Sequence, residues 1–361
     1  MIKKYLILGG TGPIGIGITN LLSQGEGNKV YITTRQVIKS QTQNVIYITG
    51  DAHDNTFLSP LLESANWDAI IDCMIYSYFE FEARLDNLLI NTKQYIYMSS
   101  ATVFAESTEP ITEKSPKLLD VCKDESFVYS DVYAITKARQ EKLLQESKYR
   151  NWTIARPYIT YGDYRLQLGC TEKEYWLYGA LQYRPIVFAK DISEKYVTMT
   201  DCNDVGKSIV ALLGNPQALS TDFNVVNNHA LKWMDVLNIY LDALEQYHGY
   251  RPKVYLTPKY ETYQGGGRYE DYVYDRLYNR IFSNNKLSEI IDVTTFTTPQ
   301  EGLTKCVRNF IEKPQFKSIN FISEIYKARL TDEWPSLNEI KGLRKKIFFE
   351  LVKYRIIPMS L

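Results

Sequence analysis

The sequence YLILGGTGPIGIGI, residues 5–18, decides the fold. Its apolar run over 5–8 predicts a buried strand, and residues 13–24 predict a helix. The turn between them carries Gly9, Gly12 and Gly15 at GxxGxxG spacing. A strand, a glycine-rich turn and a helix in this order are typical of the first βαβ unit of a dinucleotide-binding sheet.

Each glycine has an expected task in such a turn. Gly9 allows the tight turn, Gly12 lets the backbone approach a pyrophosphate, and Gly15 lets the helix pack closely on the strand. The N-terminus of the helix would offer free N–H groups to the phosphates. A purely structural glycine turn is the alternative. The residues expected to contact the cofactor here are Gly9, Thr11, Gly12, Pro13, Ile14 and Gly15.

Working outward, apolar strand-like runs alternate with helical patterns throughout the first 160 residues. This alternation predicts an α/β fold with a doubly wound parallel sheet and a smaller, irregular C-terminal lobe for the substrate. The expected strands cover 5–8, 30–34, 45–49, 69–74, 94–100 and 152–157, and the expected helices cover 13–24, 55–65, 79–90, 129–147 and 204–215. The expected domains are 1–160 plus about 191–221 for the dinucleotide, 161–190 with 222–330 for the substrate, and a tail over 331–361.

The C-terminal tail contains WPSLNEIKGLRKKIFFELVKYRIIP (334–358), which mixes basic and large apolar residues. Such a pattern can lie on a membrane surface. Glutamates within it and the interruption at Gly342 favour the other interpretation, a terminal helix docked on its own domain or on a second subunit.

The composition excludes several classes of function. Lys and Arg (42) balance Asp and Glu (42), whereas a nucleic-acid-binding surface calls for a basic excess. Five cysteines without a CxxC pair, together with three histidines, argue against a disulfide framework and a metal site. No signal peptide or membrane-spanning run is expected, so the cytoplasm is the expected location.

The end of the second strand bears on the choice of cofactor. A carboxylate there would bind the ribose 2′-hydroxyl of NAD, but this chain has Thr33, Thr34 and Arg35. The sequence therefore favours NADP(H) over NAD(H), although Arg35 could instead stack on the adenine. After the third strand, Asp51 could accept from the adenine amino group with Ala52 packed beside it, or it could simply form the turn after Gly50.

A catalytic set is suggested by YAITK (133–137) and by a serine at a strand end. Tyr133 and Lys137 lie four positions apart, on one face of the expected helix. A neighbouring ammonium lowers the pKa of a tyrosine, which can then move a carbinol proton while a nicotinamide carries the hydride. Ser100 ends the strand at the same sheet edge and would bind the substrate oxygen. Alone, a YxxxK pair could be an ordinary surface pair.

In these motifs the chain resembles the extended short-chain dehydrogenase/reductase family, the NAD-dependent epimerase/dehydratase group. The resemblance covers about residues 1–215 and implies hydride transfer on a nucleotide-sugar-like molecule by a homodimer. It also implies that Ser100, Tyr133 and Lys137 are catalytic and that Pro157 and Tyr158 lie beside the nicotinamide. The matching segments are GGTGPIG (9–15), GDA (50–52), SSATVF (99–104), YAITK (133–137), RPYITYG (156–162) and DCNDVG (201–206).

The chain departs from the family pattern in two places. Dehydratases carry Thr-Asp-Glu where this chain has Ser100-Ala101-Thr102, so 4,6-dehydration is not expected. Many relatives hold the diphosphate with an arginine before the DCNDVG-like segment, where this chain has EKYVTMT (194–200). The replacement candidates are Arg165, Arg276 and Arg280, each of which could also be an ordinary surface or packing arginine.

Three functions remain open at this point. An epimerase would keep and regenerate its cofactor, whereas a ketoreductase would bind NADPH and release NADP⁺. Arg35 favours the ketoreductase, and family frequency favours the epimerase. A non-catalytic regulatory or RNA-binding member of the superfamily is the third, and the intact Ser-Tyr-Lys set argues against it.

Overall fold

The computed structural model describes residues 2–260 and 267–357. The chain forms two units. The first comprises Met1–Gly162, Thr198–Ala230 and Ile281–Pro299, and the second comprises Asp163–Val197, Leu231–Arg280 and Gln300–Leu361. Each unit is built from segments that are distant in the sequence, so the chain passes between the two units several times.

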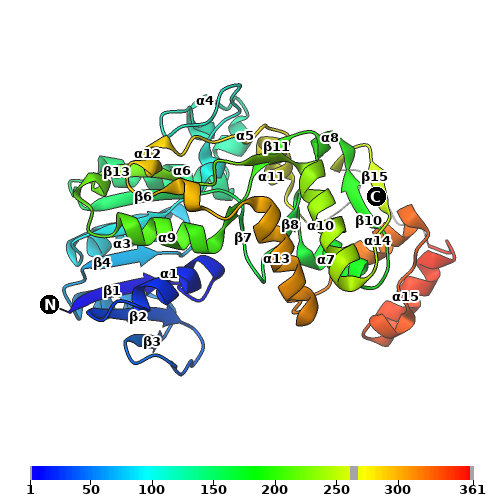
Figure 1. Ribbon diagram of the computed structural model, residues 1–361, viewed down its shortest axis with the longest axis horizontal. Helices are drawn as coiled ribbons and strands as arrows, with labels where there is room; N and C mark the ends of the chain where they lie inside the picture. The colour runs from blue at the N-terminus through cyan, green and yellow to red at the C-terminus, as the bar shows by residue number, and fades with distance from the viewer. Residues whose placement is uncertain (1, 261–266, 358–361) are drawn as a thin grey trace. The chain divides into compact units, whose positions relative to one another are not determined.

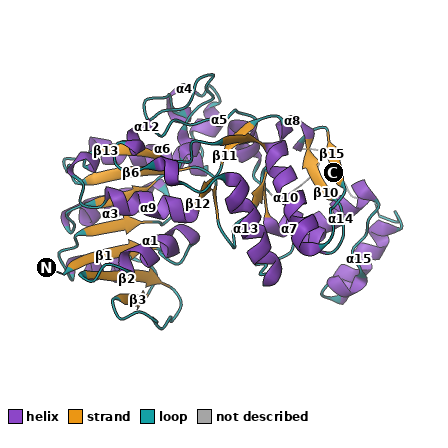
Figure 2. Ribbon diagram, in the orientation of Figure 1, coloured by secondary structure: helices purple, strands orange, loops and turns teal. Residues whose placement is uncertain are grey.

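A seven-stranded sheet forms the centre of the first unit, with every strand pair parallel. The strand order is β13-β6-β5-β4-β1-β2-β3, and Figure 2 shows these strands as one layer. The predicted doubly wound α/β fold is therefore confirmed. The strands are β1 (Lys3–Leu8), β2 (Asn28–Thr34), β3 (Val45–Thr49), β4 (Ala69–Asp72), β5 (Tyr95–Met98), β6 (Trp152–Pro157) and β13 (Thr221–Val225).

The apolar run of β1 shows why the sheet is covered on both faces. Tyr5 and Ile7 belong to the core that includes α1 and α9, while Leu6 and Leu8 belong to the core on the opposite face. Successive side chains of a strand point to opposite faces, so a strand that is apolar at every position must be buried on both. Figure 1 shows α1 and α9 side by side along one face of the sheet.

The helices of the first unit begin and end close to the predicted positions. The residues 129–147 are predicted as one long helix, but 129–132 form a non-helical connection after α5 and only Tyr133–Glu146 form the helix α6. The helices are α1 (Pro13–Ser23), α2 (Asn55–Glu63), α3 (Tyr78–Ile90), α4 (Leu118–Val121), α5 (Glu125–Val128), α6 (Tyr133–Glu146), α9 (Cys202–Leu212) and α12 (Asn285–Ser288). A short parallel pair, β7 (Thr160–Tyr161) and β12 (Thr200–Asp201), completes the unit.

The boundaries of the units differ from those expected. The sequence predicts that 222–330 belong to the substrate lobe, but β13 pairs with β6 and becomes the seventh strand of the sheet. Leu287, Val293 and Phe296 pack into the α1–α9 core, which places 281–299 in the first unit as well. The residues 191–197 lie in the second unit rather than with the sheet. The tertiary contacts of these short segments determine the unit to which each belongs.

The second unit is mainly helical and contains two small strand pairs, parallel β10–β15 and antiparallel β8–β9. The strands β11 (Tyr196–Thr198) and β14 (Ala230–Lys232) span the unit boundaries. The other elements are β8 (Gln167–Leu168), β9 (Thr171–Glu172), α7 (Lys173–Leu181), β10 (Ile186–Ala189), α8 (Lys190–Ser193), α10 (Trp233–His248), β15 (Val254–Thr257), α11 (Tyr269–Asp271), α13 (Pro299–Glu312), α14 (Phe321–Thr331) and α15 (Leu343–Lys353).

The tail is part of the second unit rather than a separate body. Arg184, which follows α7, bonds to Glu324 of α14 at 3.1 Å and to Glu339 at 2.9 Å. The helix α15 packs Phe349 and Val352 against Ile325 of α14. One face of the terminal helix is thus docked on its own unit. None of the helices in the described ranges is both long and apolar enough to cross a membrane.

Candidate active site

The glycine-rich turn lies at the carboxyl end of β1, where ligands bind in open α/β sheets. Gly9 has a φ of 68°, in the left-handed region that favours glycine. Its N–H donates to Thr33 Oγ1 at 3.0 Å, which ties the turn to the end of β2. A Cβ on Gly15 would lie 2.5 Å from the backbone of Gly10, so the helix packs directly on the turn.

The N-terminus of α1 has the features of an anion-binding end. Pro13 occupies the first turn of the helix, which carries no acidic residue and receives no side-chain cap from Gly12. A Cβ built on Gly12 meets nothing within 4 Å, so the space beside it is open. Free N–H groups, the positive end of the helix dipole and open space fit a pyrophosphate.

Two residues expected near the adenosine lie at neighbouring strand ends. Arg35 follows β2 and is exposed. The Oδ1 of Asp51 accepts from the N–H of His53 at 3.0 Å, as a turn-forming aspartate does. Ala52 is buried, and its carbonyl accepts from Arg84 at 2.8 Å. The contacts of Asp51 and Ala52 shape the loop, and their adenine-binding role stays a prediction.

Tyr133 begins α6, and Lys137 lies one turn later on the same helix. The Nζ of Lys137 donates to the carbonyl of Met98 at 2.8 Å and to that of Met74 at 3.3 Å. It lies 4.5 Å from the ring centroid of Tyr97 and 5.9 Å from that of Tyr133. The helix thereby fixes the ammonium group at the carboxyl edge of the sheet, beside the tyrosine ring.

Burial is the main influence on the ionisation of Lys137, which is 2% exposed. It lowers the pKa of Lys137 to about 8, against the opposing attraction of Asp72. Asp72 ends β4 and is fully buried, so its own pKa is raised. Its carboxylate accepts from the Tyr95 hydroxyl at 2.7 Å and from the Met74 N–H at 3.0 Å. Asp72 therefore supports the loop that receives one of the bonds of Lys137.

The two serines after β5 make different contacts, as their alternating positions predict. Ser100 accepts from the Thr102 hydroxyl at 3.0 Å and from the Thr102 N–H at 3.3 Å. Ser99 donates to Glu141 at 2.5 Å. Ser100 therefore belongs to the strand-end loop, while Ser99 joins a buried network beneath α6.

That network is centred on Glu141 and Arg156, both fully buried. The guanidinium donates to the two oxygens of Glu141 at 2.7 and 2.8 Å and lies 2.8 Å from Asp222 of β13. Lys117 is 2.8 Å from Glu141 on its other side. Although burial alone would raise it, Arg156 and Lys117 hold the pKa of Glu141 below its usual range. The network fixes α6 to β6 and to the edge strand β13.

Pro157 and Tyr158, expected beside the nicotinamide, end β6 and begin the following loop. The ring of Tyr158 is 1% exposed and packs on Phe282 with centroids 4.9 Å apart. Ile159 follows with a φ of 24°, which is unusual for a β-branched residue. Strained backbone of this kind gathers at ligand sites, which agrees with a binding role for the loop.

The three arginines expected at the diphosphate lie in the second unit. Arg280 is fully buried with its Nε 2.7 Å from Asp275, and buried Arg276 also contacts Asp275 and donates to the Gly169 carbonyl at 3.1 Å. The Arg165 side chain is 40% exposed and lies 3.9 Å from Glu172. Arg276 and Arg280 therefore fit the alternative role of packing arginines. Arg165 is the better candidate of the three for binding a diphosphate.

The sequence analysis did not identify several residues that support the site. Asp72 and Arg156 each place a charge in an apolar strand, AIID or WTIARP, and this break in the pattern was the available signal. Arg84 also donates to the His53 carbonyl at 3.0 Å and lies 4.4 Å from the Tyr76 ring centroid. No local pattern marks Arg84, because Ala52 and His53, whose carbonyls it binds, lie 32 and 31 residues earlier in the sequence.

The lowered pKa of Lys137 predicts a specific dependence of stability on pH. Between about pH 8 and the ordinary value of 10.5, the unfolded chain holds a proton that the folded chain has lost. The free energy of unfolding of the unmodified protein, relative to Lys137→Met, should therefore rise by about 1.4 kcal/mol per pH unit in this window. Urea denaturation at several pH values measures this difference. The exposed control Lys142→Met should show no such slope, and a flat or falling difference for Lys137→Met would contradict the assignment.

Comparisons with known proteins agree with this geometry. The NAD dependent epimerase/dehydratase family matches residues 5–225, more than half of the chain. No curated protein sequence matches. The UDP-glucuronic acid 4-epimerase of Bacillus cereus, in complex with UDP-glucuronic acid and NAD, is 15% identical with a TM-score of 0.65, and the match covers 86% of this chain and all of that one (100%).

Two further structures show the same fold at low identity. The dTDP-glucose 4,6-dehydratase of Bacillus anthracis, in complex with NAD, is 14% identical with a TM-score of 0.65 over 86% of this chain and 97% of that chain. The enzyme WbmH of Bordetella bronchiseptica, in complex with NAD⁺, is 14% identical with a TM-score of 0.64 over 87% of this chain and 100% of that chain. With its glycine turn, strand-end serine and YxxxK helix on this sheet, the chain belongs to the NAD dependent epimerase/dehydratase family.

Proposed function

We propose that this protein is an NAD(P)-dependent epimerase or ketoreductase that acts at a carbinol or keto carbon of a nucleotide-sugar-like molecule. The observation that carries the proposal is the position of Lys137. The side chain is buried at the carboxyl edge of the sheet, where it is hydrogen-bonded to the Met98 carbonyl at the end of β5 and to the Met74 carbonyl in the loop after β4, and it lies beside the Tyr133 ring. Burying an ammonium group is unfavourable, so a purely structural role would be better filled by an apolar side chain.

In this proposal each of the three residues has a separate task. Tyr133 gives or takes the carbinol proton, and Lys137 favours the tyrosinate through its charge. Ser100 donates its O–H to the same substrate oxygen and so orients it. A bound nicotinamide would supply the hydride chemistry. The Gly9–Gly15 turn and the α1 N-terminus would hold its pyrophosphate, because their open space and free N–H groups fit that group.

The cofactor preference depends on Arg35, which is exposed at the end of β2. We expect NADP(H) to bind better than NAD(H), and Arg35→Ala to weaken NADP(H) binding by about 1–3 kcal/mol, the range of a charge-assisted hydrogen bond. NAD(H) binding should change little, as isothermal titration calorimetry with both cofactors would measure. Equal losses for both cofactors would mean that Arg35 stacks on the adenine. A preference for NAD in the unmodified protein would rule out the assignment.

The reaction itself distinguishes the two enzymatic forms and the non-catalytic alternative. The purified protein is incubated with UDP-, dTDP- and GDP-linked hexoses and with their keto derivatives, and products are separated by chromatography. An epimerase changes the sugar with no net use of cofactor. A ketoreductase oxidises one NADPH for each keto group reduced. Cofactor binding without turnover of any of these substrates would instead favour a regulatory protein.

A further inference from the structure

The helix α15 has two faces with different surroundings. Phe349 and Val352 are fully buried and pack with Ile325 of α14 and with Ile340. The ring of Trp334 meets that of Phe349 with centroids 5.6 Å apart. These contacts account for the stable docking of the helix, and they use only one side of it.

The opposite face of α15 carries large apolar residues that the protein itself does not cover. Leu343 is 74% exposed, Ile347 52% and Tyr354 68%. Positions separated by four and seven residues fall within a narrow arc of a helix, so these three side chains form one apolar stripe. Phe348 is 39% exposed and lies on the side of α15 that faces α14, and Ile356, which follows the helix, is 67% exposed. Residues 343–356 therefore combine an unusual amount of exposed apolar surface in one place.

The same segment is strongly basic in a chain whose net charge is zero. Residues 341–357 contain six cationic side chains and one acidic side chain, Glu350. Lys341, Arg344 and Lys345 are all exposed. The cationic residues are Lys341, Arg344, Lys345, Lys346, Lys353 and Arg355. An apolar stripe flanked by cations is the pattern of a helix that lies in the interface of an anionic membrane.

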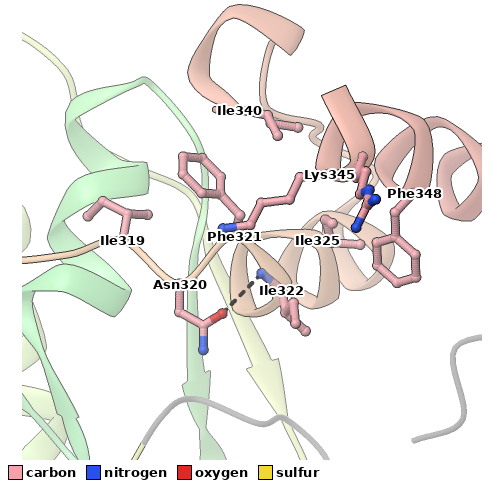
Figure 3. Close-up of a pocket in the computed structure, with 9 residues that line it drawn as sticks. Ile319, Asn320, Phe321, Ile322, Ile325, Ile340, Lys345 and Phe348 are labelled. Atoms are coloured by element: carbon pink, nitrogen blue, oxygen red, sulfur yellow. Dashed lines mark hydrogen bonds between the residues drawn. The ribbon is translucent and has the colours of Figure 1, made fainter. Parts of the chain in front are cut away.

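A cavity of about 280 Å³ lies between α14 and α15, on the side of α15 that carries Phe348. Figure 3 shows Ile322, Ile325 and Phe348 among the side chains that line it. Arg344 and Lys345 belong to the same lining, so basic groups border an apolar hollow. This combination suits a ligand with an anionic head and an apolar tail.

We propose that α15 docks this protein on the surface of an anionic lipid bilayer. The stripe of Leu343, Ile347 and Tyr354 enters the boundary between headgroups and acyl chains, and the flanking cations bind lipid phosphates and carboxylates. Charge complementarity favours a membrane over a second copy of the chain. A two-fold interface would place the same patch, with its six cations, against itself, and like charges would repel.

Sedimentation with vesicles tests the proposal on the full-length protein. Vesicles of phosphatidylcholine alone are compared with vesicles that also contain phosphatidylserine. The protein should partition onto the anionic vesicles only, and less at high salt. Arg344→Gln/Lys345→Gln should lower the partition coefficient about 30-fold, from roughly a factor of five for each cation. Leu343→Gln/Ile347→Gln should lower it by about ten-fold or more.

The matched control is Val121→Gln/Lys123→Gln, which removes one exposed apolar residue and one exposed lysine from another surface. It should bind vesicles like the unmodified protein, and far-UV circular dichroism should show all variants folded. Equal binding to both kinds of vesicle, or to neither, would overturn the proposal. So would a dimer in sedimentation velocity that Leu343→Gln/Ile347→Gln converts to a monomer without any vesicle binding, because a second copy would then cover the stripe.

Discussion

Replacing Tyr133 by phenylalanine should lower turnover by about 10²–10⁴-fold, the usual value of acid–base assistance. The substitution removes only the hydroxyl, and the ring stays beside Lys137, whose Nζ lies 5.9 Å from its centroid. Cofactor affinity should therefore change little. The measurement is kcat on a converted substrate, with cofactor binding followed separately by calorimetry.

Tyr129→Phe is the matched control for this substitution. Tyr129 is 78% exposed and lies in the connection before α6, so the loss of its hydroxyl should leave turnover unchanged. Lys137→Met should reduce both turnover and cofactor affinity, since the lysine favours the tyrosinate form of Tyr133 and would reach the nicotinamide ribose. Ser100→Ala should lower turnover less than Tyr133→Phe does, because Ser100 orients the substrate oxygen without moving the proton. Near-normal turnover by Tyr133→Phe would contradict the proposed mechanism, whatever the fold.

Replacing Arg156 by methionine should lower the free energy of unfolding by about 3–5 kcal/mol, the cost of removing one partner from a buried ion pair. Arg156 is fully buried and forms ion pairs with both Glu141 and Asp222. Because Lys117 stays 2.8 Å from the fully buried Glu141 after the substitution, we expect a loss near the lower end of this range. Urea denaturation of the two proteins measures the difference.

The control for Arg156→Met is Lys148→Met. Lys148 lies 3.9 Å from Asp86 with both side chains about three-quarters exposed, and such a pair contributes little. Its loss should change the free energy of unfolding by less than about 0.5 kcal/mol. A loss for Arg156→Met as small as that of this control would mean that the network does not hold α6 in place.

The central sheet could be predicted because its signal is local. Each of the first six strands is a short apolar run, and the turn before α1 has glycines at a spacing that few other structures need. The prediction of the family came from motifs in the same part of the chain, and it is confirmed by the match over residues 5–225.

The seventh strand could not be predicted in the same way. The residues of β13, TDFNV, include Asp222 and Asn224, which are unfavourable in a buried strand. They are tolerated because Asp222 binds Arg156, while the side-chain amide of Asn224 donates to the Ile111 carbonyl at 3.4 Å. The inner face of α6 follows the same logic. This face buries Gln140 and Glu141, whose partners lie on other elements.

In the candidate site too, contacts between residues close in the sequence could be predicted, and contacts between distant residues could not. Tyr133 and Lys137 could be paired from the sequence, because helical spacing alone puts them on one face. Asp72 could not be related to Lys137, since nothing local indicates that the carboxyl ends of β4 and β5 enclose the lysine. Arg276 and Arg280 are suitable for a diphosphate by residue type, but Asp275, which directly precedes Arg276 in the sequence, contacts both of them.

Transfer of deuterium from the cofactor to the substrate tests the central claim most directly. NADPH or NADH carrying deuterium at the reactive carbon of the nicotinamide is incubated with the protein and a keto-sugar nucleotide, and the product is analysed by mass spectrometry and NMR. The proposal predicts deuterium on the new carbinol carbon, at a rate that collapses in Tyr133→Phe. A product that takes the hydrogen on this carbon from solvent water, or no product at all despite bound cofactor, would contradict the claim.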